Sequence, residues 1–361
     1  MSYSLAGKLS SLTPYDPIEG NFEVRLDANE SYYNINEEYP EIFSKALSEI
    51  KFNRYPDPYA DSVSKAFAEY YDIKPEYVTA GNGSDELISI ITGCFLEKGD
   101  KVVTLTPDFS MYAFYPGLYE LEVVSFKKEN DLSADVDKLI ECCNSVNAKM
   151  LIFSNPCNPT SLGITRSDVI KILDNVKCLV VLDEAYMDFW TESLLDKTGE
   201  YDNLIILKTC SKSIGMAGIR LGFAVAGEKL TQALKMVKSP YNTDSVSQKL
   251  AETVFKMKDI LKEKNREIVS QNAFLLSEIK KLHEKYPDIL EKAYESVTNF
   301  VFVKTKFSEQ IFSALKDKSI IIRKFNGFIR ITAGSINENS ALISGLSEAL
   351  ADIKEGINEN G

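Results

Sequence analysis

The sequence is short of the residues that several kinds of active site require. It contains one histidine, His283, in 361 residues, at the charged end of an amphipathic stretch where we expect a solvated surface position. A Ser-His-Asp triad needs a positioned histidine, and histidine-rich metal sites need several, so we expect neither. Acid–base work near neutral pH would then fall to a carboxylate, tyrosine, cysteine or lysine, and we expect no bound metal.

Long apolar runs and excess positive charge are missing as well. The longest apolar stretch, LISIITGCFL at 87–96, is too short to cross a bilayer, and the N-terminus lacks the pattern of a signal peptide. The formal net charge is −12, whereas nucleic acids and anionic membranes attract basic surfaces. We expect a cytoplasmic protein that acts on small molecules, with no nucleic-acid or membrane partner.

Paired cysteine motifs are the third absence. None of the six cysteines forms a CxxC pair, and most lie in apolar surroundings. This indicates reduced thiols that serve as small core residues. Cys210 alone stands near a candidate site, because it precedes Lys212 by two positions.

Short apolar runs alternate with helical patterns through the middle of the chain. The strand candidates are 101–106, 121–126, 149–154, 178–183, 203–208 and 221–226. Apolar strands separated by helices predict a mostly parallel α/β sheet that is covered on both faces. In such sheets ligands bind beyond the carboxyl ends of the strands.

The pattern changes near residue 240. A helical stretch of roughly 244–285 is followed by a strand at 297–304, a helix, two strands (IIIRKF and GFIRITAG) and a final helix. We predict a large domain at 46–240, and a smaller α/β domain formed by 241–361 together with residues 1–45. The first 45 residues show no strong sheet pattern and should pack on the small domain or on a partner subunit.

Three polar groups stand where a ligand should bind. Asp183 ends the strand CLVVLD, where it could cap a helix or hold a protonated ligand nitrogen. In GNGSDELI a glycine-rich turn enters a helix, and the free N–H groups around Gly83, Ser84 and Asp85 could bind phosphate. In SNPCNPTSLG the prolines fix a turn that leaves Asn158 free to point inward, although a purely structural turn fits equally.

The stretch TCSKSIGMAGIRLG adds a lysine. Lys212 follows a buried strand, among the hydroxyls of Thr209 and Ser211, with Arg220 eight positions later. A lysine whose pKa is depressed by burial and nearby positive charge can form a Schiff base with an aldehyde. With Asp183 for a pyridine nitrogen, and with Thr209, Ser211, Arg220 and the helix amides after Gly83 for a phosphate, the set suits pyridoxal 5′-phosphate.

These motifs resemble those of the fold-type I, pyridoxal-phosphate-dependent aminotransferases of class I/II, and within that class the histidinol-phosphate aminotransferases. The matching elements span about residues 10–335, in the order LTPYDPI, LDANES, NRYPDP, GNGSDELI, TPDFSMY, SNPCNPT, LDEAYMDF, TCSKSIGMAGIRLGF and FIRITAG. The resemblance implies a large domain with a mostly parallel seven-stranded sheet between helices, plus a smaller α/β domain.

The resemblance also implies roles around the cofactor. Lys212 would carry the Schiff base and move the reaction's proton, and Asp183 would pair with the pyridinium. Tyr186 and Asn158 would hydrogen-bond the ring's phenolic oxygen. Phe109 would stack on the ring, although an aromatic residue after a turn is often simple core packing.

For the substrate the resemblance implies a second set. Arg330 would bind a carboxylate, and Arg323, on the adjoining strand, would contact a substrate phosphate unless it is a plain surface arginine. Tyr15 and Asn29 would close the pocket from the N-terminal segment. Tyr55 would reach the cofactor phosphate of the neighbouring subunit, so a homodimer with shared active sites is implied.

The expected reaction is transamination between L-histidinol phosphate and 2-oxoglutarate, yielding imidazole-acetol phosphate and glutamate, a step of histidine biosynthesis. An aromatic amino-acid aminotransferase and a threonine-phosphate decarboxylase remain open, because they share the cofactor and fold. A lysine-dependent hydrolase using Ser211 or Thr209 is the alternative from another class, and a nicotinamide oxidoreductase fits less well because GxGxxG is broken at Glu86. One departure from the family is Ser161, where relatives usually carry the glycine of NPTG, which leaves the geometry of that loop open.

Overall fold

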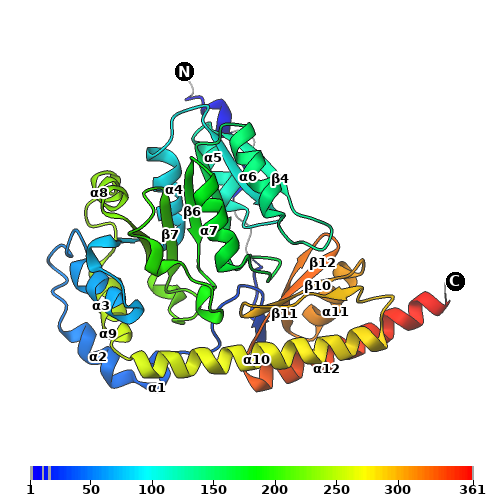
Figure 1. Cartoon of the computed structure of the whole chain (residues 1–361). Helices are drawn as coiled ribbons and strands as arrows, with labels where there is room; N and C mark the ends of the chain where they lie inside the picture. Colours follow the sequence, from blue (N-terminus) through cyan, green and yellow to red (C-terminus); the bar gives the residue numbers. More distant parts are fainter. Residues whose placement is uncertain (1–2, 10–11, 15–17, 360–361) are drawn as a thin grey trace.

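Two sheets organise the computed structural model of the chain, which describes residues 3–9, 12–14 and 18–359 (Figure 1). The larger sheet has seven strands in the order β2-β8-β7-β6-β5-β3-β4. Their bounds are β2 Val78–Gly81, β3 Lys101–Thr106, β4 Glu122–Lys127, β5 Met150–Ser154, β6 Leu179–Asp183, β7 Leu204–Thr209 and β8 Gly222–Ala226. Only β8 runs antiparallel to its neighbours, so the predicted mostly parallel seven-stranded sheet is confirmed.

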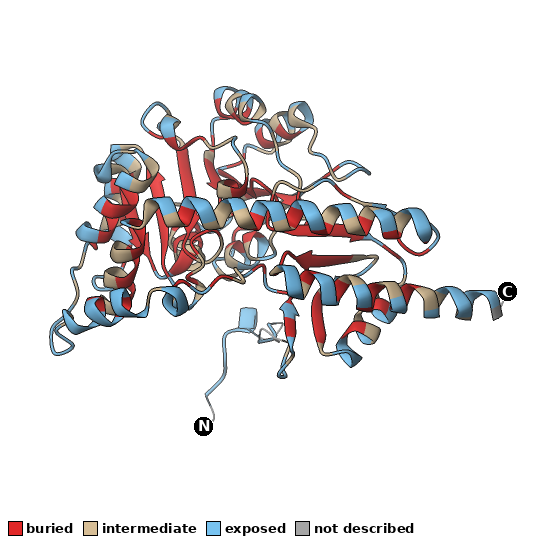
Figure 2. Ribbon diagram, turned by 90° about the horizontal axis from the view of Figure 1, so that it is seen from below, coloured by how far each residue is buried: buried red, intermediate tan, exposed pale blue. Residues whose placement is uncertain are grey.

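Both faces of this sheet are covered, as the apolar strands require. In β6, Val180 and Leu182 join the apolar cluster on one face, while Val181 between them joins the cluster on the other. The helices around it are α3 Asp61–Tyr71, α4 Gly83–Cys94, α5 Met111–Leu118, α6 Val136–Ser145, α7 Arg166–Asn175, α8 Glu228–Val237 and α9 Ser245–Phe255. Seen from below, the strands are buried between helices whose outer surfaces are exposed (Figure 2).

The second sheet has five strands in the order β1-β11-β12-β10-β9. Their bounds are β1 Val24–Leu26, β9 Lys292–Ala293, β10 Phe300–Lys304, β11 Ile320–Phe325 and β12 Phe328–Thr332. Helices α10 Lys258–Lys285, α11 Ser308–Asp317 and α12 Ile336–Glu359 accompany it. The smaller α/β unit is thus present, whereas the exact domain boundaries stay a prediction.

The structure adds detail to the N-terminal segment and corrects the stretch 244–285. In the N-terminal segment, β1 pairs in parallel with β11 of the small sheet, as expected, whereas α1 Ile35–Glu38 and α2 Pro40–Ser48 place Ile35 and Phe43 in the apolar cluster of the large sheet. The stretch 244–285 is two helices, since α9 ends at Phe255 and α10 begins at Lys258. Apolar residues of α9 pack in the core of the large sheet, while the later turns of α10 pack on the small sheet, so the chain changes direction where the periodicity continues.

Single residues also differ from expectation. His283 is half-buried at the end of α10, with its Nδ1 against the carbonyl of Leu290, and not fully solvated. All six cysteines are free thiols, of which Cys94 is exposed and Cys142 half-buried, so the core role holds for the other four. Within the part of the chain that the structure describes, no helix has the length and apolarity to cross a membrane.

Candidate active site

The polar residues predicted at strand ends do meet at one edge of the large sheet. Ser154 at the end of β5 is in register with Asp183 at the end of β6, and β7 ends at Thr209 on the next strand along. Because β5, β6 and β7 are parallel, their carboxyl ends lie at the same edge. The candidate site is therefore built on rigid strand termini.

Asp183 is a buried carboxylate with two donors. Its Oδ2 accepts a hydrogen bond from the Tyr112 hydroxyl at 2.7 Å, and its Oδ1 accepts one from the backbone N–H of Ala185 at 2.9 Å. Burial raises the pKa of Asp183 to about 6, against the lowering effect of these two donors. Such a carboxylate gains stability from a cation placed beside it.

The glycine-rich turn and the start of β8 leave an open cradle. A side chain at Gly222 would approach the Ser84 amide nitrogen to 2.5 Å, and one at Gly83, where φ is +78°, would approach the Arg220 guanidinium to 2.9 Å. Glycine at both positions lets the amino end of α4, the end of β7 and Arg220 come together. The hydroxyl of Thr209 donates to that of Ser211 at 3.0 Å in the same region.

Charged side chains of both signs surround this cradle. Arg220 lies 3.7 Å from the Asp85 carboxylate, and both side chains are about half exposed. Glu86, which replaces the last glycine of a GxGxxG motif, accepts from the Asn82 amide and from Asn242, each at 2.6 Å. Its carboxylate is thus engaged at the helix start, while the other N–H groups of the first turn of α4 and the guanidinium supply positive potential.

Lys212 lies between the N-terminal segment and Tyr186. Its Nζ donates to the Ala28 carbonyl at 2.9 Å and lies 5.7 Å from the centre of the Tyr186 ring. The Tyr186 hydroxyl accepts from Asn29 Nδ2 at 2.9 Å. The lysine is half-buried, less enclosed than its apolar sequence context indicates, whereas Tyr186 and Asn29 are buried.

Arg330 joins the small sheet to the turn after β5. It is buried, its guanidinium donates to Asn158 Oδ1 and to the Asp27 carbonyl, and it lies over the Phe300 ring. Asn158 is therefore held by Arg330 and is not free to point anywhere else. Arg323 stands directly opposite Arg330 in the β11–β12 pair and is half-buried. Two like charges opposite each other destabilise a sheet unless an anion lies between them.

The roles predicted for Phe109, Tyr55 and Tyr15 remain predictions. Phe109 is half-buried, edge-on to Tyr112 at 5.5 Å, which brings it near Asp183. Tyr55 is 81% exposed and stacks on Tyr241, with no contact to the cradle in this chain. Tyr15 lies outside the described residues.

Some residues around the site escaped the sequence reasoning. Tyr112 lies within TPDFSMY, but no local pattern pairs it with Asp183, 71 positions away. Asp188, two residues after Tyr186, accepts from buried Lys208 at 2.6 Å and from the Tyr71 and Ser213 hydroxyls. Ser213 is the next residue after Lys212, so this hydrogen-bond network holds the chain in place beside the lysine.

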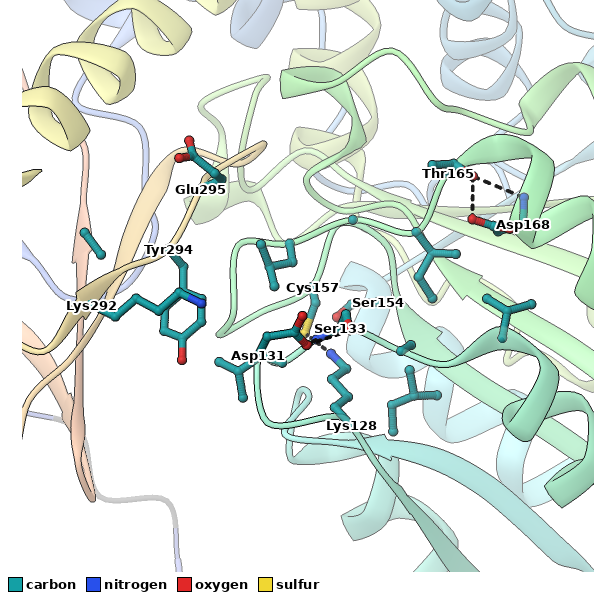
Figure 3. Close-up of a pocket in the computed structure, with 18 residues that line it drawn as sticks. Lys128, Asp131, Ser133, Ser154, Cys157, Thr165, Asp168, Lys292, Tyr294 and Glu295 are labelled. Atoms are coloured by element: carbon teal, nitrogen blue, oxygen red, sulfur yellow. Dashed lines mark hydrogen bonds between the residues drawn. The ribbon is translucent and has the colours of Figure 1, made fainter.

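A cavity of about 490 Å³ lies next to the site and is lined by none of its predicted residues (Figure 3). Its walls come from the loops after β4 and β5 and from the segment around β9. Inside it, Lys128 Nζ donates to Cys157 Sγ at 2.9 Å, and burial raises the pKa of that thiol. Cys157 adjoins Asn158, so the cavity borders the turn that Arg330 holds.

Comparison with known proteins defines the class. A family model of class I and II aminotransferases matches residues 23–346, and the chain therefore belongs to the class I and II aminotransferase family. Its curated relatives include histidinol-phosphate aminotransferases of Clostridium novyi (strain NT), 41% identical over 96% of this chain and 97% of that one, and of Pyrococcus furiosus, 34% identical over 97% and 99%. The resemblance drawn from the motifs is confirmed.

Solved structures agree on the fold. The chain is similar to the histidinol-phosphate aminotransferase of Sinorhizobium meliloti in complex with pyridoxal-5′-phosphate, with a TM-score of 0.86 and 23% identity over 98% of this chain and 99% of that one. The enzyme of the same name from Clostridium acetobutylicum has a TM-score of 0.82 and 18% identity over 91% and 99%. At such identities the likeness concerns the architecture.

Proposed function

We propose that the chain binds pyridoxal 5′-phosphate at the carboxyl ends of β5, β6 and β7. The residues fit that group at three points. The glycine cradle before α4, with Arg220 and the hydroxyls of Thr209 and Ser211, fits a phosphate dianion. The buried Asp183 carboxylate fits a protonated pyridine nitrogen, and the Lys212 amine fits the aldehyde carbon.

When bound, the cofactor supplies an electron sink for the carbanion formed at the substrate's α-carbon. Asp183 holds the proton on the ring nitrogen, because its buried anion is stabilised by a neighbouring cation. Tyr112 and Ala185 fix that carboxylate in one orientation through their hydrogen bonds. Tyr186 and Asn158 would hold the ring through hydrogen bonds to its phenolic oxygen.

Lys212 then serves as the acid–base group. Its amine would take the proton from the substrate's α-carbon and release it again as the amino group is transferred. Its present contacts, to the Ala28 carbonyl and over Tyr186, keep the amine on the side of Asn29 and the small domain. Phe109, next to Tyr112, would cover the ring face.

We further propose L-histidinol phosphate as the amino donor and 2-oxoglutarate as the acceptor. The observation that carries this choice is the pair Arg323 and Arg330, opposite each other on adjacent strands. Two planar guanidinium groups can donate hydrogen bonds to the phosphate of one substrate and to a carboxylate of the other. The near full-length relatives, 32–41% identical, are named histidinol-phosphate aminotransferases, which supports the same donor. We also propose that the protein is cytoplasmic and forms a homodimer.

The test is the absorbance of the purified protein. A yellow band that bleaches with L-histidinol phosphate and returns with 2-oxoglutarate is the expected result. L-tyrosine and L-threonine phosphate are tested in parallel as amino donors. If only one of these bleaches the band, that compound is the substrate and the cofactor chemistry is unchanged. Release of carbon dioxide without an amino acceptor would replace transamination by decarboxylation. If no band appears after pyridoxal 5′-phosphate is added, Lys212 does not form a Schiff base with it.

A further inference from the structure

Ser161 adopts a backbone conformation that favours glycine. Its φ is +63°, in the left-handed region, and it is fully buried in the turn after β5. A residue with a Cβ is strained there, whereas glycine adopts this conformation without strain. A serine that persists in this conformation must gain something from its side chain.

The side chain contributes one hydrogen bond to the small domain, and the backbone of Ser161 contributes another. Ser161 Oγ lies 2.9 Å from the Glu295 carbonyl and shares its single proton with the nearer Thr160 carbonyl. The backbone N–H of Val297 donates to the Ser161 carbonyl at 3.1 Å. On its other side the Ser161 amide donates to the Cys157 carbonyl at 2.9 Å. Ser161 therefore binds its own turn and the segment 295–297 at once.

That segment leads to the proposed substrate pocket. Two residues beyond Val297, the buried Asn299 donates to the Asn29 carbonyl at 3.2 Å and accepts from the Ala333 amide at 2.8 Å. Asn29 in turn donates to the Tyr186 hydroxyl. Residues 295–299 thus connect the turn that carries Asn158 to the opposite wall of the site.

The turn is joined to the small domain by the bond of Ser161 Oγ to Glu295, by that of the Val297 N–H to the Ser161 carbonyl, and by that of Arg330 to Asn158. The cavity of about 490 Å³ lies beside it, with Cys157 and Leu162 on the side of the turn and Tyr294 and Glu295 on the side of the small domain. Figure 3 shows Tyr294 and Lys292 across open space from Cys157. Since side chains do not fill this gap, the turn meets the small domain there through these hydrogen bonds, while Tyr186 packs on Phe300 elsewhere between the two parts.

We propose that Ser161 is a positioning residue that holds the small domain, and with it Arg330, against the Asn158 turn before any substrate arrives. The proposal rests on the proposed function only in taking Asn158 and Arg330 as cofactor and substrate contacts. Glycine would relieve the strain but would lose the bond to Glu295. Alanine would keep the strain and lose the bond.

The first test is hydrogen exchange of the full-length protein, with and without pyridoxal phosphate, in Ser161→Ala and Ser161→Gly. Amides of residues 294–299 should exchange about fivefold faster in both variants, as expected for loss of one hydrogen bond. Thermal unfolding should rank the parent chain first, Ser161→Gly next and Ser161→Ala last. Ser319 offers a matched control, because it has φ +60° and bonds β1 by its carbonyl and hydroxyl, away from the site. Ser319→Ala should leave exchange at 294–299 unchanged.

The second test separates positioning from mere stability. In Ser161→Ala, KM for the anionic substrate that bleaches the absorbance band should rise about fivefold with kcat within twofold, since the small domain closes less often on the turn. Unchanged exchange at 294–299, or an unchanged KM, would overturn the proposal. If the parent chain does not react with L-histidinol phosphate, the proposed substrate is wrong. The hydrogen-exchange result would still decide whether Ser161 holds residues 294–299.

Discussion

At the scale of single residues, Asp183 makes the stability of the cofactor-free protein depend on pH. Its pKa in the folded chain, about 6, lies above the ordinary 3.8. Between these pH values the folded state keeps a proton that the unfolded state has released, so the free energy of unfolding falls as pH rises. The full shift corresponds to about 3 kcal/mol.

Asp183→Asn removes this titration. Relative to the parent chain, the cofactor-free variant should gain up to about 3 kcal/mol between pH 4 and pH 7, measured by urea unfolding across that range. Tyr112→Phe is the companion variant, because it deletes the hydrogen-bond donor that lowers the pKa of Asp183. The pKa of Asp183 should therefore rise further, and the free energy of unfolding of this variant should keep falling up to a higher pH than in the parent chain. Parallel pH profiles for Asp183→Asn and the parent would exclude Asp183 as the titrating group.

The ion pair of Lys208 and Asp188 gives a second residue-scale prediction. Lys208 is 2% exposed, and its ammonium lies 2.6 Å from the Asp188 carboxylate. Asp188→Ala would leave that ammonium buried without its counter-charge and should lower the free energy of unfolding by about 3–5 kcal/mol. The exposed pair Lys98–Glu120 is the control, and Glu120→Ala should change the free energy of unfolding far less, because water screens this pair. Equal effects in denaturant titrations would show that burial does not matter at Asp188.

Residue types at strand ends could be predicted from the sequence, whereas their partners could not. Asp183, Thr209 and Lys212 follow buried strands, and the ligand-site rule for parallel sheets brings them together. Tyr112 and Asp188 find their partners through packing of distant elements, which leaves no local pattern. Arg330 was expected, but its bond to Asn158 depends on how the two sheets meet.

At the scale of elements, Gly222 decides how closely β8 approaches α4. A Cβ there would lie 2.5 Å from the Ser84 nitrogen and 2.7 Å from the Gly83 carbonyl carbon, and backbone atoms cannot move aside cheaply. Gly222→Ala should therefore displace the helix start and weaken pyridoxal phosphate binding by about tenfold or more, since a hydrogen-bonded dianion depends on that geometry. Titration of the absorbance band measures it.

Gly218 supplies the matched control for this variant. It lies in the turn Ala217–Ile219 between Lys212 and β8, and a Cβ there would meet no atom within 4 Å. Gly218→Ala should bind the cofactor like the parent chain. If both alanine variants weakened binding alike, the loss would come from the flexibility of the loop and not from the approach of β8.

Element prediction succeeded where the pattern was long and periodic. Six of the seven strands of the large sheet follow from apolar runs, whereas β2, with four residues, and β1, with three, are too short to show alternation. The break between α9 and α10 does not show in the sequence for a different reason. The apolar periodicity continues across it, although α9 packs in the core of the large sheet and the later turns of α10 pack on the small sheet.

At the scale of the whole molecule, the exposed surface around Tyr55 supports the proposed homodimer. Tyr55 is 81% exposed and stacks on Tyr241 at 4.7 Å, and Phe52, three residues before Tyr55, is 74% exposed. Apolar side chains gathered on a surface mark an interaction site. A twofold axis would bring Tyr55 of each subunit to the other's cradle.

Mixing two inactive variants tests this arrangement. Lys212→Ala removes the acid–base group and Tyr55→Ala the proposed phosphate contact. If Tyr55 acts across the interface, a heterodimer of the two variants has one intact site, because Lys212 of one chain meets Tyr55 of the other. Unfolding and refolding the two together at equal amounts should then restore about a quarter of the parent activity, since half the dimers are mixed and each has one working site. If Tyr55 served its own chain, every site would lack one of the two groups and the mixture would stay inactive.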